Sequence, residues 1–157
     1  MTSPVPRSVV QAFYEAYVSR DPDRIAAFLD DDVEWVGAGP VELLRFCGHR
    51  RGKAAVIEFF AHLVPSVLQF KGFEPEELLV DGDRAATAGK LSGIQLTTGR
   101  MISYRCSQFL RFRDGKITSF RALIDSFDAA EQMLGHRIDL QQKADRAGTA
   151  AGDLVVV

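Results

Sequence analysis

Apolar residues in the first part of the chain recur at the spacing of an α-helix. Ser3 followed by Pro4 predicts a helix start, with the serine as N-cap and the proline in the first turn. Four residues then form one apolar stripe: Val10, Phe13, Tyr14 and Tyr17. A second, shorter helix is predicted after Asp21, which serves as its cap, and Pro22, which takes its first position.

The next segment alternates between strand, irregular and helical patterns. Val33 and Trp35 share one face of a predicted strand at 31–36. Residues 37–52 read as an irregular crossing bounded by glycines, and residues 53–64 as a third helix that Pro65 stops. The inward stripe of that helix is Val56, Phe59, Phe60 and Leu63.

The second half of the chain has the period of strands. Asp-Gly pairs at 81–82 and 114–115 are strong hairpin signals, and Pro75 and Gly93 mark bends or bulges. Four long antiparallel strands are expected: 68–79, 85–96, 101–113 and 116–124. A last helix is expected over 128–147, with a break near Gly135.

These elements predict an α+β fold in which three N-terminal helices pack on a strongly curved, mostly antiparallel sheet. Helices across a concave sheet leave a cone whose open end is a pocket. We expect one domain over residues 1–140 and a C-terminal tail over 141–157.

Composition narrows the ligand classes. Eleven phenylalanines among 157 residues suit a large apolar interior that encloses an apolar ligand. The net charge is −2 and the longest basic cluster is His49–Arg51, which argues against nucleic-acid binding. No apolar run approaches the roughly 20 residues of a membrane span, and the N-terminus lacks a signal-peptide pattern.

The cysteines favour a reducing compartment, and the spacing of the cysteines and histidines does not predict a metal site. Cys47 and Cys106 form no CxxC pair, and free thiols suggest a cytoplasmic protein. Nothing has zinc-ligand spacing, and the acidic residues at 30–34 read as a solvated turn. We therefore expect neither a metal nor another cofactor.

Two stretches resemble a known family. The segment 73–127, with "DGDR" at 81–84 and "RFRDGKI" at 111–117, and "GHRRGKAAVIEFF" at 48–60 resemble the SnoaL-like polyketide-cyclase and ketosteroid-isomerase-like branches of the nuclear transport factor 2-like superfamily. The resemblance covers roughly residues 9–134. It is specific for the fold and weak for activity, because this fold carries isomerases, cyclases, hydrolases, dehydratases and plain binders.

The chain lacks the three chemical groups of a steroid isomerase. In the resembling enzymes an Asp moves the proton while a Tyr and a protonated Asp stabilise the dienolate oxygen. The matching positions here are Phe13 for the Tyr, Trp35 or Val36 for the base, and Gln108 for the second Asp. A true steroid Δ-isomerase is therefore not expected.

The cyclase-like branch offers a different acid/base. Its pattern I-x-x-x-R-x-x-x-D falls on Ile117, Arg121 and Asp125, and a histidine that often accompanies the Asp corresponds to Gln108. The resemblance thus implies Asp125 as acid/base and Gln108 as a hydrogen-bond donor to a substrate oxygen. An amide cannot move a proton, so a two-group relay is not expected.

Asp125 has a second interpretation. If Phe120, Ala122 and Ile124 face the cavity, strict alternation turns Asp125 away, where it would cap a helix beginning near Phe127. A bulge at the strand end would reverse this. Gln108 sits on a strand face with apolar neighbours, which favours a pocket-lining role. The expected pocket walls are Phe13, Tyr14, Tyr17, Trp35, Phe59, Tyr104, Leu110 and Phe120.

Three functional hypotheses follow. The first is an isomerase- or cyclase-type enzyme that transfers protons on a small hydrophobic carbonyl compound. The second is a non-catalytic carrier or sensor of an apolar molecule in the same pocket. The third is an assembly module with a solid core. In addition, Phe109 beside Ser107 and Arg111 on the outer sheet face, together with the pairing common in the resembling family, predicts a homodimer.

Overall fold

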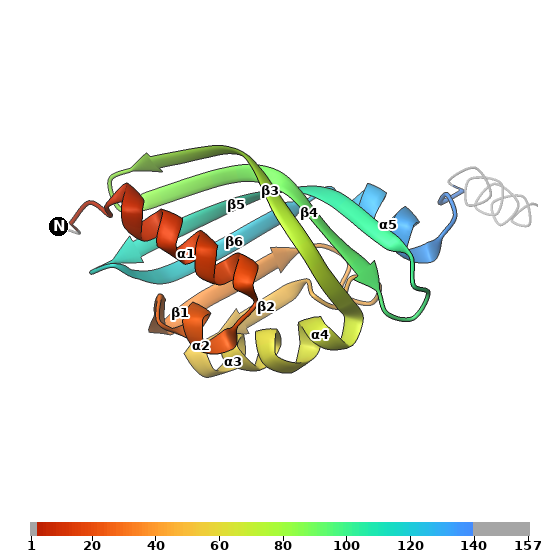
Figure 1. Cartoon of the computed structure of the whole chain (residues 1–157), viewed down its shortest axis with the longest axis horizontal. Coiled ribbons are helices and arrows are strands. Elements are labelled where there is room, and N and C mark those ends of the chain that lie inside the picture. The colour runs from red at the N-terminus through yellow and green to blue at the C-terminus, as the bar shows by residue number, and fades with distance from the viewer. Residues whose placement is uncertain (1–2, 140–157) are drawn as a thin grey trace, which may run out of the picture.

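The computed structural model describes residues 3–139, which form one curved six-stranded sheet with helices on its concave face. The strand order is β2-β1-β6-β5-β4-β3, antiparallel except for the parallel pair β1 and β6, and the sheet is not closed (Figure 1). The strands are β1 (Leu29–Ala38), β2 (Gly48–Arg51), β3 (Leu68–Asp81), β4 (Arg84–Gln95), β5 (Met101–Arg113) and β6 (Lys116–Ile124). The predicted α+β fold is confirmed.

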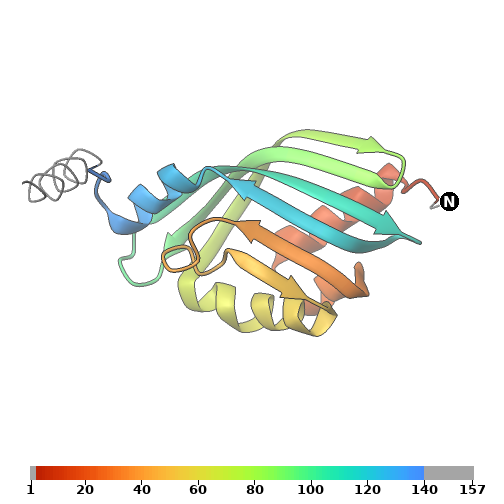
Figure 2. The ribbon, with the colours of Figure 1, turned by 180° about the vertical axis from the view of Figure 1, so that it is seen from behind.

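The helices leave the outer face of the long strands uncovered. Figure 1 shows α1 across the concave face, and Figure 2 shows β5 and β6 from behind with α1 on the far side. The helices are α1 (Arg7–Ser19), α2 (Pro22–Ala26), α3 (Lys53–Glu58), η1 (Phe59–Leu63), α4 (Val64–Val67) and α5 (Ser126–Leu134). Within residues 3–139, none of them is long and apolar enough to cross a membrane.

The two N-terminal helices begin differently. α1 begins at Arg7 after Pro6, which is extended and makes no side-chain cap, so the predicted start at Ser3 and Pro4 is wrong. α2 begins as predicted, because the Asp21 carboxylate accepts hydrogen bonds from the backbone N–H groups of Asp23 and Arg24.

The segment 37–52 is less irregular than predicted, since it contains β2. Glu34 pairs with Arg51 and Gly37 with Gly48, which adds an antiparallel edge strand to β1. The sequence of β2, Gly-His-Arg-Arg, has no alternation of apolar residues that would predict a strand. Its strand conformation depends on the hydrogen-bonded pairing with β1.

Pro65 does not end the third helix. The chain passes from α3 through the wider π-helical turn η1 into α4, and Pro65 occupies the first turn of α4. A π turn changes the hydrogen-bond register, so the missing proline N–H falls where the helix restarts. The widened turn also lets the neighbouring residues Phe59 and Phe60 both face the interior, where both are buried.

Both predicted hairpins form, but only the second has the predicted Asp-Gly turn: in the first, Asp81 pairs with Arg84, so the turn residues are Gly82 and Asp83. Arg113 pairs with Lys116 across a two-residue turn in which Asp114 and Gly115 have φ angles of 50° and 73°, as a type I′ turn requires. Bulges in β3 lie between Phe70 and Gly72 and between Pro75 and Glu77. These irregularities curl the sheet over the helices.

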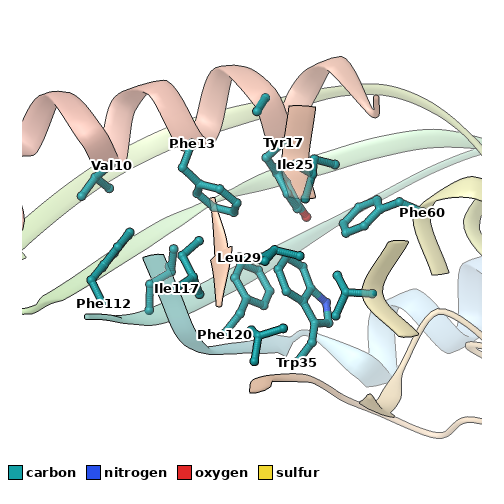
Figure 3. Packing of buried hydrophobic residues seen from close by; sticks show 14 of the residues in the cluster. Val10, Phe13, Tyr17, Ile25, Leu29, Trp35, Phe60, Phe112, Ile117 and Phe120 are labelled. Atoms are coloured by element: carbon teal, nitrogen blue, oxygen red, sulfur yellow. The ribbon is translucent and has the colours of Figure 1, made fainter. Parts of the chain in front are cut away.

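The inward face of the sheet is buried, and one part of it is solid. Alternate residues of β5 point inward from Ile102 to Phe112. We call the tightly filled region under the first half of α1 the packed end (Figure 3). Its residues are Val10, Phe13, Leu110, Phe112 and Ile117, each 3% exposed or less.

The C-terminal helix α5 ends earlier than predicted. Its C-cap is Gly135, whose left-handed φ of 78° matches the predicted break, and residues 136–139 are not helical. The rest of the predicted helix and the tail over 141–157 lie outside the described residues.

Candidate functional site

Beyond Leu110 the interior opens into a pocket of about 70 Å³ between the sheet, α1 and η1. We call this region the hollow end. Eight of its 18 lining residues are aromatic: Tyr17, Trp35, Phe46, Phe59, Phe60, Phe70, Tyr104 and Phe120. The expected walls Tyr17, Trp35, Phe59, Tyr104 and Phe120 are thus brought together around one space. Its volume is below the roughly 300–1,000 Å³ of drug-sized sites, which favours a small ligand.

Closely packed aromatic rings line the hollow end. The Trp35 and Phe120 rings lie 3.7 Å apart between centroids and only 5° from parallel. Phe60 meets Trp35 edge-on at 5.4 Å, and the Tyr17 ring descends from α1 beside them (Figure 3). Such packing fixes the ring positions, so the apolar wall of the pocket is preformed.

Gln108 supplies the polar corner of the hollow end. The residue is 1% exposed, and its amide nitrogen Nε2 donates to the Tyr17 hydroxyl at 3.2 Å and approaches the Cys106 sulfur at 3.9 Å. Its oxygen Oε1 is buried and has no partner among the described residues. A buried amide oxygen without a hydrogen bond costs about 1–3 kcal/mol, so Oε1 is placed to accept from a ligand or a water.

Burial favours the neutral form of three groups in the hollow end: Cys47, Tyr104 and Cys106. Burial raises the pKa of the Cys47 and Cys106 thiols to about 11. Burial also raises the pKa of Tyr104 well above its ordinary value, helped by the neighbouring Tyr17. No carboxylate or imidazole is among the described residues that line the pocket. The lining therefore contains no base suited to proton transfer near neutrality.

Asp125 lies outside this pocket. Phe120, Ala122 and Ile124 line it, and alternation turns Asp125 to the exposed side. The Asp125 carboxylate is the N-cap of α5 and accepts a hydrogen bond from the Asp128 backbone N–H at 3.3 Å. This is the capping geometry that the sequence offered as the second interpretation, and no bulge at the end of β6 reverses it.

Three other expected wall residues lie elsewhere. Phe13 and Leu110 belong to the packed end and do not reach the pocket. Tyr14 projects toward an outer groove beside β3, where its ring stacks on Phe73 with centroids 6.0 Å apart. Its buried hydroxyl has no described partner, and burial raises its pKa. The helical spacing predicted that these rings lie on one side of α1. It did not predict which end of the interior each ring would reach.

Arg20 is a site residue that the sequence did not single out. Its guanidinium carbon lies 4.2 Å from the centre of the Tyr17 ring and 3.8 Å from that of Phe70. It lines both the pocket and an outer groove bounded by α1, α4 and β3. The only available signal was its place three residues after Tyr17 on the inward stripe, whereas Phe70 is distant in sequence.

The described side chains that could coordinate a metal ion do not form a metal site. Within residues 3–139, no three histidine, cysteine, aspartate or glutamate side chains gather where they could hold a metal ion. The two pocket thiols are the nearest approach to such a set, and their raised pKa disfavours the thiolate form that binds metals.

Solved structures share this fold. A proposed isomerase from Rhodopseudomonas palustris is 31% identical, with a TM-score of 0.71 over 81% of this chain and 93% of its own. TerC, co-crystallised with polyporic acid, is 26% identical, with a TM-score of 0.63 over 75% and 89%. An NTF2-like protein from Burkholderia pseudomallei is 24% identical, with a TM-score of 0.69 over 84% and 96%.

A search of curated proteins finds no match. The SnoaL-like domain, by contrast, matches residues 10–120, which include all six strands up to Phe120 and the helices that form the hollow end. The chain therefore belongs to the SnoaL-like domain family, with the nuclear transport factor 2-like fold that its sequence predicts.

Proposed function

We propose that the protein binds a small, ring-containing molecule in the hollow end and that Gln108 hydrogen-bonds an oxygen of that molecule. The observation that carries this proposal is the Gln108 amide, buried in an aromatic pocket with one half unpartnered. Sites for small molecules are mostly apolar with a few placed polar groups, and the hollow end has this composition.

The amide suits either a carbonyl or a hydroxyl ligand. Tyr17 can engage only one half of the amide at a time. With Nε2 bonded to Tyr17, Oε1 accepts from a hydroxyl; with the amide turned over, Tyr17 donates to Oε1 and Nε2 donates to a carbonyl. The stacked pair Trp35 and Phe120 then supports the face of the ring.

Binding is better supported than proton-transfer catalysis. An isomerase or cyclase needs a base within hydrogen-bond reach of the substrate, and the nearest sequence candidate, Asp125, is exposed and caps α5. The similarity to TerC, which was co-crystallised with polyporic acid, supports a ligand in this fold without assigning chemistry to this chain.

Trp35 provides the assay, because it is the single tryptophan and lines the pocket. Titration with acetophenone should change its fluorescence saturably, and ethylbenzene, which lacks the oxygen, should bind more weakly. One hydrogen bond to a buried amide predicts a preference of about 5- to 10-fold. Gln108→Leu should abolish that preference while still binding ethylbenzene.

The matched control is Ser107→Ala, the next residue on β5, whose side chain points to the opposite face. It should leave both affinities within about twofold, since it removes a polar group from the same strand without touching the pocket. If Gln108→Leu keeps the preference for acetophenone, the proposed hydrogen bond is wrong. If neither compound binds at millimolar concentration, the proposed function is wrong.

A further inference from the structure

Arg20 carries a charge that no described residue neutralises. Its Nε atom is buried without a hydrogen-bond partner, and no carboxylate among residues 3–139 lies within ion-pair distance of its guanidinium. Tyr17 and Phe70 lie over its faces at 4.2 and 3.8 Å. Rings occupy the faces of a guanidinium but leave its donors free, because the N–H groups point outward in its plane.

Arg50 shows what a structural arginine looks like in this protein. It also stacks on a ring, that of Phe59, at 4.0 Å. Its Nη2, however, donates to the backbone carbonyls of Arg45 and Cys47 at 3.4 and 3.2 Å, which ties the crossing segment to β2, although its Nη1 lacks a partner. Arg20 has the rings without any such acceptor.

The backbone at Arg20 gives an independent indication. Arg20 is the C-cap of α1 with φ 56° and ψ 13°, a left-handed conformation for which glycine is the usual residue. A side chain at such a position adds strain, and strained residues cluster at ligand sites.

The surroundings of Arg20 favour a negative charge. The pocket and the outer groove lie side by side, because five residues line both: Arg20, Phe60, Val64, Leu68 and Phe70. Arg20 is the charged residue among these five. The outer groove adds Lys71, and no aspartate or glutamate is among the described residues that line either space. An anion there would gain a charge-assisted, bidentate contact with the guanidinium edge.

We propose that the pocket selects anionic ring compounds, with a carboxylate or an equally delocalised oxyanion bound by the free edge of Arg20. This inference rests on the proposed function, since it names the ligand class of the same pocket. The ring lies against Trp35 and Phe120, the oxyanion meets Arg20 at the mouth, and Lys71 helps to draw it in from the outer groove.

Benzoate and benzamide separate charge from shape, because they have nearly the same size and differ in charge. By Trp35 fluorescence, the wild-type protein should bind benzoate at least about tenfold more tightly than benzamide, as expected for a charge-assisted contact in a partly buried site. Arg20→Gln should weaken benzoate binding by about tenfold or more and leave benzamide within about threefold.

Two further variants guard against a folding effect. Arg24→Gln removes an exposed arginine of α2 and should leave both affinities within about twofold. Arg20→Lys keeps the charge but loses the planar fork, so its benzoate affinity should fall between those of the wild type and Arg20→Gln. The ratio of benzoate to benzamide affinity in the wild-type protein is independent of any folding effect, because it needs no variant.

The outcomes separate the two proposals. The anion selectivity would be overturned if the wild type bound benzoate and benzamide equally well. It would also be overturned if Arg24→Gln weakened benzoate binding as much as Arg20→Gln does. Either result would leave the proposed function standing. Binding of neither compound at millimolar concentration would also overturn the anion selectivity, whereas the proposed function is overturned only if acetophenone and ethylbenzene fail to bind as well.

Discussion

The packed end and the hollow end are two halves of one interior, built on the same inward face of β5. Leu110 and Phe112 fill the first half together with Phe13 and Ile117, all of them apolar. Gln108 and Cys106 stand on the same face of the same strand, yet the space before them is open. Every one of these β5 residues is at most 5% exposed.

The difference shows that burial and filling are separate properties. The alternation of buried and exposed residues along β5 is equally regular at both ends. It therefore determines which face of the strand is inward, but not whether side chains fill the space in front of that face. The polarity of the inward residue marks the change, because Gln108 is placed where a well-filled core would have another apolar side chain. We expect the packed end to determine stability and the hollow end to determine binding.

The largest expected effect is at the packed end. Phe112→Ala should lower the free energy of unfolding by about 3–5 kcal/mol, since it removes a fully buried ring and leaves a cavity in close-packed surroundings. Urea denaturation followed by circular dichroism measures this loss. The matched change at the hollow end, Phe70→Ala, removes a half-buried ring beside an existing space and should cost less than half as much. Equal losses would contradict the comparison.

Alkaline pH should act on the hollow end, which holds two buried thiols. The pKa values of Cys47 and Cys106 are raised from 9.0 to about 11 by burial, so folding favours their neutral forms. This stability is fully present below pH 9 and is lost as pH rises through about 11; we expect a decrease of about 2–5 kcal/mol from the two thiols.

Urea denaturation at pH 8 and at several values up to pH 11 tests this expectation, with Trp35 fluorescence as a reporter from the hollow end. Cys106→Ala removes one of the two titrating groups, so its stability should decrease less steeply over the same pH range. Identical pH dependence in the variant and the wild type would show that the buried thiols do not contribute.

The outer face of the sheet should act independently of both interior ends. Phe109, Leu123 and Leu79 are 46–58% exposed there and share a surface groove with Arg111 and Arg121. We predict that this face pairs two copies of the chain, and that Phe109→Asp weakens the pairing by about 2 kcal/mol or more. Sedimentation at micromolar concentration should give a dimer for the wild type and a monomer for the variant, with acetophenone binding unchanged. A monomeric wild type would refute the pairing.

The smallest expected effect is at Asp125. As the N-cap of α5, its replacement by alanine should cost about 0.5–2 kcal/mol of stability. Because its carboxylate is exposed and outside the pocket, Asp125→Ala should leave acetophenone affinity unchanged. A thermal melt and a fluorescence titration of the same variant measure both. A tenfold loss of affinity without a loss of stability would instead support a role in the pocket.

Local signals predicted most of the fold. The Asp-Gly turn at 114–115 and the cap at Asp21 depend on residues adjacent in sequence, and both appear as predicted. β2 was missed because a four-residue polar strand is specified by its partner β1 and not by its own pattern. The helix through Pro65 was missed because a π turn changes the register that the proline rule assumes.

The sequence predicted some residues of the candidate site and missed others. Gln108 was identified from the position of a histidine in the resembling family, and also because an amide among apolar inward residues needs a partner. Arg20 was not, because its stacking on Phe70 depends on how β3 curls toward α1. Phe13 was assigned to the pocket because helical spacing gives the face of α1 but not the depth of the space below it.

The most direct test of the account is to locate a bound ligand by nitrogen-15 NMR. The chain has one tryptophan, so its indole N–H signal is assigned without ambiguity. On addition of acetophenone, the Trp35 indole signal and the Gln108 side-chain amide signals should shift and saturate together, with one dissociation constant. Saturable shifts confined to the outer sheet face around Phe109, with the Trp35 and Gln108 signals unmoved, would contradict the claim that the hollow end is the binding site.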